Sequence, residues 1–412
     1  MSDASPSSGA SHEEPAAVPP QRALGEVAVS FLKLGCISFG GPVAHLGYLH
    51  EEYVRRRRWL SDETYGDLVA LCQFLPGPAS SQLVFALGMK RGGIAGAFLA
   101  SLCFTLPSAV LMIAFGYGVT AMGDLADAGW LHGLKLAAVA VVAQAVWGMG
   151  VKLCPDRPRI TLAIAAAALV LVLPGALGQI GVIVGGAIAG WVLYRREPVA
   201  PRTVSAALSG RHLWAGAILI TCVALLFVLP AVAAATGWKT AGLFDAFYRA
   251  GSLVFGGGHV VLPLLRAEVV PPGWVTDDAF LAGYGAAQAL PGPLFTFAAY
   301  LGTINTTSLS GWPGGLWCLL GIFLPAWMLV GGALPFWNLL RSKAWTQAAM
   351  RGANAAVVGV LLAALYNPVW REGVTNAQDV AVGLAAFLLL HAWKTPPWLV
   401  VGLTAAAGQW LL

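Results

Sequence analysis

The segment Gln73-Phe74-Leu75-Pro76-Gly77-Pro78 returns 215 positions later as Gln288-Ala289-Leu290-Pro291-Gly292-Pro293. Each copy interrupts an apolar run that is otherwise long enough to span a bilayer. Two prolines one residue apart cannot continue an α-helix, because each lacks an N–H group and its ring clashes with the preceding turn. Freed backbone groups at membrane depth persist mainly where protein or a water-filled cavity covers them. A matched pair of such breaks in two halves of a chain therefore predicts a transporter's binding site.

Composition places most of this chain in a membrane. Hydrophobic residues make up 58% of the 412 residues and charged residues only 10%, whereas soluble proteins are about a quarter charged. The uncharged runs 92–123 and 279–340 far exceed the roughly 20 residues that a spanning helix needs. The sequence therefore predicts an all-α polytopic membrane protein.

Charge and cysteine usage give no sign of an enzyme or a cofactor. The net charge is +5, but the basic residues lie in short loops, where they hold loops on the cytoplasmic side. This topological role is favoured over recognition of nucleic acid or acidic lipid. Six cysteines without a Cys-x-x-Cys pair suggest no metal or disulfide framework. No nucleophile–base arrangement is present, so we expect a protein that is not an enzyme and has no cofactor.

The breaks belong to a tandem duplication. Phe31 and Gly35 match Phe247 and Gly251, 216 positions on, and Trp59 matches Trp274, 215 positions on. We expect a disordered tail (1–23), a first repeat (24–197), a linker with one extra transmembrane helix (198–240) and a second repeat (241–412). Equivalent apolar segments lie seven apart in the chain. Because this separation is odd, the second repeat is predicted to insert upside down, as an inverted repeat.

One loop conflicts with a simple count of crossings. Arg55 to Arg58, the densest basic run, would lie outside if segments 27–48 and 66–89 both crossed the membrane fully. If both are re-entrant, the arginines return to the cytoplasmic side. The expected fold thus has broken or re-entrant helices and about 9–13 membrane segments, and the inverted relation survives either choice.

A second duplicated element precedes each Pro-Gly-Pro. It is Phe-Gly-Gly-Pro at 39–42 and Phe-Gly-Gly-Gly at 255–258. Glycine doublets permit positive φ, and a half-helix that begins there points free N–H groups and a positive dipole end at an anion. The alternative is close helix packing by small residues. The glutamines before each Pro-Gly-Pro could donate to an oxyanion or support the unwound backbone, and both roles stay open. The candidate substrate-binding residues are Gly40, Gly41, Pro42, Gln73, Pro76, Gly77, Pro78, Gly256, Gly257, Gly258, Gln288, Pro291, Gly292 and Pro293.

Cations near these breaks are the next candidates. Lys33 and Arg249 are equivalent, while Lys90, Arg91 and Lys135 have no basic counterpart in the second half. Intramembrane cations are expensive and are functional candidates by default. For Lys90 and Arg91, a plain cytoplasmic anchor is the alternative.

His45 and His259 follow the two glycine doublets. Either could carry a proton in coupled transport, although a structural role is the usual one for a lone histidine. Ser61 and Thr276 precede matched acidic pairs, and this pattern predicts the N-caps of the following helices.

These motifs in this order, together with Gly-x-Asn-Ala-Ala-Val-Val at 352–358, resemble the chromate ion transporter (CHR) family in its long two-domain form. The resemblance begins at about Leu24 and covers nearly the whole chain. It implies proton-driven export of chromate across the bacterial inner membrane, chromate resistance, and a role for the duplicated Gly, Gln and Pro residues. The chain departs from its own repeat at Gly258, which stands where the first half has Pro42.

The sequence therefore predicts a multi-pass secondary transporter of the bacterial inner membrane with an oxyanion site near the midplane. The expected partners are chromate or a related tetrahedral oxyanion and the lipid bilayer, with no nucleic acid, and the expected assembly includes a homodimer. The alternatives are a transporter of sulfate or a related oxyanion, and an anion channel.

Overall fold

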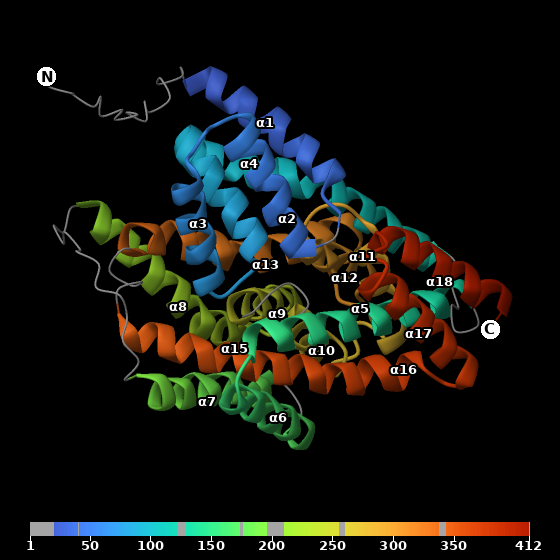
Figure 1. Cartoon of the computed structure of the whole chain (residues 1–412). Coiled ribbons are helices and arrows are strands. Elements are labelled where there is room, and N and C mark those ends of the chain that lie inside the picture. The colour runs from blue at the N-terminus through green and yellow to red at the C-terminus, as the bar shows by residue number, and fades with distance from the viewer. Residues whose placement is uncertain are drawn as a thin grey trace, which may run out of the picture.

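The computed structural model describes residues 20–39, 41–121, 129–173, 176–195, 210–254, 260–337 and 343–411, which form helices joined by short connections (Figure 1). The first half contains α1 (Pro20–Ile37), α2 (Gly41–His50), the π-helix η1 (Glu51–Arg56), α3 (Asp62–Phe74), α4 (Ala79–Ala121), α5 (Gly129–Leu153), α6 (Arg157–Val172) and α7 (Ala176–Tyr194). Between the halves lies α8 (Gly210–Thr236). The second half contains α9 (Lys239–Leu253), α10 (Val261–Val269), α11 (Asp277–Ala289), η3 (Leu294–Thr296), α12 (Phe297–Ile304), α13 (Gly311–Ala333), η4 (Leu334–Phe336), α15 (Ala344–Ala364), η5 (Leu365–Trp370), α16 (Arg371–Gly373), α17 (Ala377–His391) and α18 (Pro397–Leu411).

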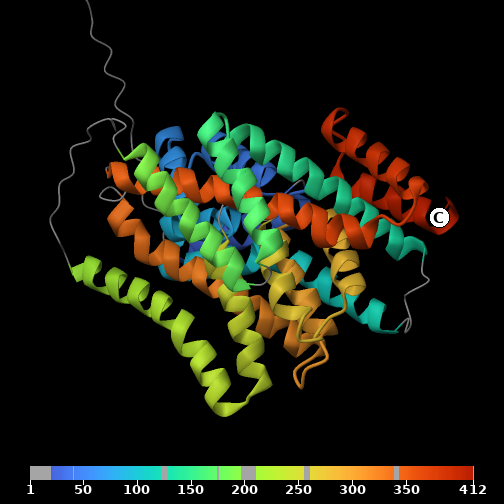
Figure 2. The same ribbon diagram turned by 90° about the horizontal axis from the view of Figure 1, so that it is seen from below.

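The expected all-α membrane class is confirmed. The described residues contain no strand, and five helical stretches are long and apolar enough to cross a bilayer: Ala79–Ala121, Gly129–Leu153, His212–Thr236, Gly311–Phe336 and Ala344–Gly373. The outer surface is apolar too. On α8, which lies at the edge of the bundle (Figure 2), Trp214 is 78% exposed and Phe227 is 71% exposed. Such a surface is stable where lipid is the solvent.

Helices α1 and α2 form a hairpin around the first glycine break. The Tyr53 hydroxyl at the end of this unit donates to Ser30 Oγ on α1 at 3.1 Å, and the Tyr53 ring lies 4.7 Å from that of Phe31. The chain therefore runs back alongside α1 after the break. This arrangement favours the re-entrant alternative, which returns Arg55 to Arg58 to the side on which α1 begins.

The Pro-Gly-Pro segments lie at the tips of a second kind of hairpin. After the first, α4 runs back until the Arg91 guanidinium lies 4.9 Å from the ring of Trp59, in the loop that precedes α3. After the second, Thr306 N donates to Trp274 O at 3.1 Å, in the loop that precedes α11. Arg91 and Thr306 are 215 positions apart, as are the two tryptophans. Both repeats thus fold the same helix–break–helix unit.

Helix caps fix where the first arm of each of these hairpins begins. Ser61 Oγ accepts from Thr64 N at 3.2 Å, and Thr276 Oγ1 accepts from Ala279 N at 3.3 Å. Each side chain satisfies one of the N–H groups that the first turn leaves without a partner. The predicted N-caps are confirmed.

The two halves are interleaved. Helix α5 of the first repeat packs against α18 of the second, and α7 packs against α15. Close approach depends on glycine, because a Cβ atom on Gly133 would collide with the Thr404 carbonyl and one on Gly352 with the Gly186 carbonyl. Gly133 and Gly352 occupy matching positions in the repeats, so both halves use the same small-residue contact to join the other.

We expect Gly352→Ala to lower the unfolding temperature of the detergent-solubilised protein. Its new methyl group must displace backbone on α7, and overpacking of this kind costs about 1–3 kcal/mol. Gly148→Ala on α5 is the matched control, since nothing lies within 4 Å of its Cβ position; a helical Gly→Ala change in open space stabilises by about 0.5–1 kcal/mol. Equal melting curves for the two variants would contradict the packing described here.

Candidate functional site

The two kinds of helix break bind each other across the repeats. Gly77 N–H donates to the carbonyl of Val254 at 2.6 Å, and Gly292 N–H donates to the carbonyl of Ser38 at 2.9 Å. Ser38 and Val254 are equivalent residues, 216 positions apart, and each directly precedes a Phe-Gly-Gly element. The Pro-Gly-Pro break of each repeat is therefore held by the glycine break of the other. This exchange places each predicted Pro-Gly-Pro beside the predicted glycine break of the other half.

Only glycine fits at the centre of each Pro-Gly-Pro. Gly77 has φ +116° and Gly292 has φ +94°, in a region that residues with a side chain rarely adopt. A Cβ atom on Gly77 would lie 2.7 Å from Gln82 Nε2, and one on Gly292 would lie 2.8 Å from Ser108 Oγ. The flanking prolines Pro78, Pro291 and Pro293 are buried.

His45 hydrogen-bonds the backbone at the first glycine break. Its ring is fully buried, stands edge-on to Phe104 at 5.5 Å, and places Nε2 3.0 Å from the carbonyl of Ser38. That carbonyl thus has both His45 and Gly292 as partners, while His45 Nδ1 is buried without a partner among the described residues. The adjacent Gly41 begins α2 with φ +74°, as expected of the doublet, and Pro42 lies in the first turn of α2.

The first turn of α4 presents polar groups that were not predicted from the sequence. Gln82 is fully buried and its Nε2 donates to the Pro76 carbonyl at 2.6 Å. Its Oε1 and the hydroxyl of Ser81 are buried and have no partner among the described residues. Unpaired buried polar atoms are costly and call for a ligand or water. Because the first N–H groups of a helix are also free and lie at its positive end, this turn can bind an anion.

The second repeat is apolar at the same place. Phe295, Thr296 and Phe297 stand 215 positions after Ser80, Ser81 and Gln82. The Thr296 hydroxyl donates to the carbonyl of Pro293 at 2.8 Å. The Pro293 carbonyl at this break thus has a hydrogen-bond partner within its own repeat. The contrast between Ser-Ser-Gln and Phe-Thr-Phe was visible in the sequence and marks the first repeat as the polar side of the site.

The two predicted glutamines differ. Gln73 lies in the last turn of α3 and is exposed, whereas Gln288 lies in the last turn of α11 and is partly buried. Gln288 Nε2 is buried without a partner among the described residues. The Tyr284 hydroxyl, one turn before Gln288, interacts with this amide, and the second N–H of Nε2 remains for a ligand. Ligand contact and backbone support stay open for both glutamines.

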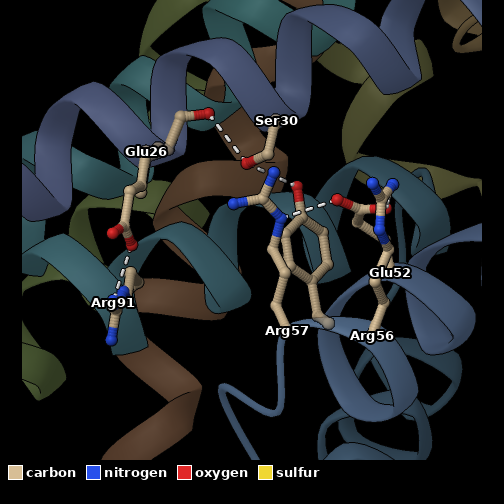
Figure 3. Close-up of polar contacts among 8 residues, drawn as sticks. Glu26, Ser30, Glu52, Arg56, Arg57 and Arg91 are labelled. Atoms are coloured by element: carbon tan, nitrogen blue, oxygen red, sulfur yellow. Dashed lines mark hydrogen bonds and ion pairs between the residues drawn. The ribbon is translucent and has the colours of Figure 1, made fainter.

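The predicted cations of the first repeat occupy different settings. Lys33 on α1 and Lys90 on α4 are exposed. Arg91 pairs with Glu26 at 2.6 Å, which ties α4 to the start of α1 (Figure 3). Lys135 pairs with Asp278 of the second repeat at 2.5 Å. The pairs of Arg91 and Lys135 hold helices together, the first within a repeat and the second between repeats.

The basic run beside Arg91 is organised around one acidic residue. Glu52 is 7% exposed, and its carboxylate accepts from Arg57 at 2.6 Å and from Arg56 at 3.1 Å (Figure 3). Burial acts to raise the pKa of the Glu52 carboxyl, but the hydrogen bonds and charges of Arg57 and Arg56 outweigh burial and lower it.

In the second repeat, Arg249 pairs with Asp245 at 3.0 Å and with Glu268 at 2.8 Å. Five predicted site residues, Gly40, Gly256, Gly257, Gly258 and His259, lie outside the described residues.

Paired broken helices that meet across two repeats in a multi-pass helical protein define the class of membrane transporters. A family model described as "Chromate transporter" matches residues 25–191 and 241–409. The chain belongs to the chromate transporter family.

Similar proteins cover nearly its whole length. A "Chromate transport protein" of Pseudomonas aeruginosa is 30% identical over 96% of this chain and 94% of its own. A "Probable chromate transport protein" of Synechococcus elongatus is 28% identical over 95% and 96%, and a "Chromate transport protein" of Cupriavidus metallidurans is 24% identical over 93% and 92%. No solved structure matches the chain.

We expect Gly292→Ala to loosen the first repeat as well as the second, because it strains the donor to Ser38. Hydrogen–deuterium exchange should rise in peptides covering residues 41–50 as well as 290–298. Gly273→Ala is the control, since Gly273 also has positive φ (+73°) but open space around it; its effect should stay near residues 270–278. Unchanged exchange over 41–50 in Gly292→Ala would rule out the cross-repeat link.

Proposed function

We propose that this protein exports chromate across the bacterial inner membrane, driven by the proton-motive force, and so confers chromate resistance. The observation that carries the proposal is the pair of reciprocal bonds, Gly77 to Val254 and Gly292 to Ser38. They join the broken hairpins of the two repeats, and buried donors without a partner among the described residues lie beside these breaks. Membership of the chromate transporter family supports chromate as the substrate.

A tetrahedral dianion suits these groups. The N–H groups of the first turn of α4, the Ser81 hydroxyl and Gln288 Nε2 are neutral donors, and the helix end adds roughly half a positive charge. Neutral donors hold an oxyanion without the cost of burying a full cation. Sulfate has the same shape and charge, so a sulfate transporter is the second candidate, because the same neutral donors suit both anions.

The exchange of equivalent contacts supports alternating access by two inverted repeats. Rocking one repeat against the other would change the hydrogen bonds between the breaks. The repeats would pivot on the glycine contacts of α5 with α18 and of α7 with α15. In this arrangement, Arg55 to Arg58 lie on the cytoplasmic side and the Lys135–Asp278 pair lies on the outer side. The homodimer stays a prediction.

The proposal is tested by flux of radiolabelled chromate and sulfate in everted membrane vesicles, with and without an imposed proton gradient. Export in the cell appears as accumulation in everted vesicles. We expect gradient-dependent accumulation of chromate in excess of sulfate. Sulfate accumulation in intact cells would favour the uptake alternative, and chromate flux that is indifferent to collapse of the gradient would favour a channel.

We expect Ser81→Ala to weaken chromate binding by roughly tenfold or more, because a hydrogen bond to a charged group is worth about 1.5–3 kcal/mol. The measurement is the chromate concentration that gives half-maximal flux. Ser101→Ala is the matched control. Ser101 is also a buried serine of α4 whose hydroxyl has no partner among the described residues, but it lies in the other arm of that helix. An equal effect of both substitutions would argue against an anion at the first turn.

A further inference from the structure

The second repeat holds two acidic side chains on one arginine. Arg249 Nη2 lies 3.0 Å from Asp245 Oδ2 on the same helix and 2.8 Å from Glu268 Oε2 on α10. Asp245 is 3% exposed, and the side chain of Glu268 is 11% exposed. We call Asp245, Arg249 and Glu268 the acidic triad.

The charges of the triad do not balance. Two carboxylates and one guanidinium carry a net charge of −1 when all three are ionised. Asp245 Oδ1 is buried without a partner among the described residues, and so is Arg249 Nε. An ionised carboxylate with an unsatisfied buried oxygen is strongly disfavoured. One proton on the triad removes the excess negative charge. If Asp245 Oδ1 takes that proton, this unpaired carboxylate oxygen becomes the hydroxyl of a neutral carboxylic acid.

Among the described residues, the neighbouring helices supply no further counter-charge to the triad. The charged group that acts on Asp245 is Arg249, and those that act on Glu268 are Arg249 and Asp245. Against α9 pack α13, which has no Asp, Glu, Lys or Arg, and α8, whose basic residues Arg211 and His212 both lie in its first turn. Cys222 of α8 accepts from the Tyr248 hydroxyl of α9.

The other charged residues described on α10, and those on α11 and α15, are engaged by partners other than the triad. On α10 itself, Arg266 is engaged by Asp277 of α11 at 2.6 Å. The other acidic residue of α11, Asp278, is engaged by Lys135. Arg351 of α15 lies over the Tyr194 ring of α7 at 5.6 Å.

The complete triad is a feature of the second repeat alone within the described residues. Glu268 has a counterpart in Glu52, 216 positions earlier, but Glu52 pairs with Arg56 and Arg57 of its own segment. On α1, the position equivalent to Asp245 is Val29, which is 68% exposed, and the position equivalent to Arg249 is Lys33. A valine that faces outward has been replaced by an aspartate that faces inward. The hairpin of the first repeat joins its arms without such an aspartate, through the Tyr53–Ser30 hydrogen bond.

The triad also lies next to the site. Arg249 precedes by five residues Val254, whose carbonyl accepts from Gly77, and Arg249 with Glu268 ties the two arms of the hairpin that carries the second glycine break. A proton on either carboxyl weakens that tie and leaves the hairpin free to shift. The charge of the triad and the position of the break are thus linked.

We propose that Asp245 and Glu268, bridged by Arg249, form the proton-binding site that couples proton movement to anion movement. In the step, one carboxylate oxygen gains a proton to give a carboxylic acid, and the same O–H bond breaks when the proton leaves on the other side of the membrane. This inference rests on the proposed function, because it names the group that the proton-motive force acts on. It adds a site to His45 and His259, the candidates predicted from the sequence.

The test uses the purified full chain in proteoliposomes with an internal pH-sensitive dye. Two quantities are measured: proton movement driven by a chromate gradient, and exchange of labelled for unlabelled chromate at equal pH. We expect Asp245→Asn and Glu268→Gln to lose chromate-driven proton movement and to keep chromate exchange, because exchange needs no net proton transfer. Asp62→Asn is the control: Asp62 is an exposed carboxylate with one partner, His50, at 2.7 Å, and both quantities should match wild type.

The outcomes separate this inference from the proposed function. If wild-type protein moves no chromate, the proposed function fails. If wild type moves chromate and protons and the amide variants do so equally, the acidic triad is not the coupling site. A variant that loses both quantities is compared with Asp245→Glu and Glu268→Asp, which keep a titratable carboxyl. Recovery of proton movement in these supports the proposal, and failure of amide and carboxyl variants alike makes the triad structural and overturns it.

Discussion

The hydrogen bonds from Gly77 to Val254 and from Gly292 to Ser38 are the interaction on which the rest of the structure depends. The prolines around each glycine unwind the helix and free backbone groups. A peptide group left unpaired in an apolar environment costs roughly 2–7 kcal/mol. Each repeat satisfies the break of the other, so the duplication is a requirement of the site, and neither half has a complete set of partners alone.

On this shared frame the two repeats have diverged in their polar groups. Backbone contacts are matched: Gly35 lies against the Phe104 carbonyl and Gly251 against the Ile322 carbonyl, at equivalent positions. Polar groups are not matched. Ser81 and its neighbour on α4 belong to the first repeat, and the acidic triad belongs to the second. We infer a division of labour, in which the first repeat supplies more of the anion site and the second repeat supplies the proton site.

Local physical chemistry made much of this predictable from the sequence. Paired prolines predicted the breaks, and Ser61 and Thr276 predicted the caps, because each effect acts within a few residues. The partner of Gly77 could not be predicted, since Val254 is far away in the chain and only the fold brings them together. Arg249 was a candidate as a cation, but its two acidic partners depend on the α9–α10 hairpin. The Ser81 position could have been found by comparing the two repeats residue by residue.

The most direct test of the central claim is a cryo-EM reconstruction of the protein in lipid nanodiscs with chromate present. The account predicts density for a tetrahedral anion at the first turn of α4, with the Pro-Gly-Pro of each repeat in contact with the glycine break of the other. Breaks that pair within their own repeats, or an anion bound away from all four breaks, would contradict it.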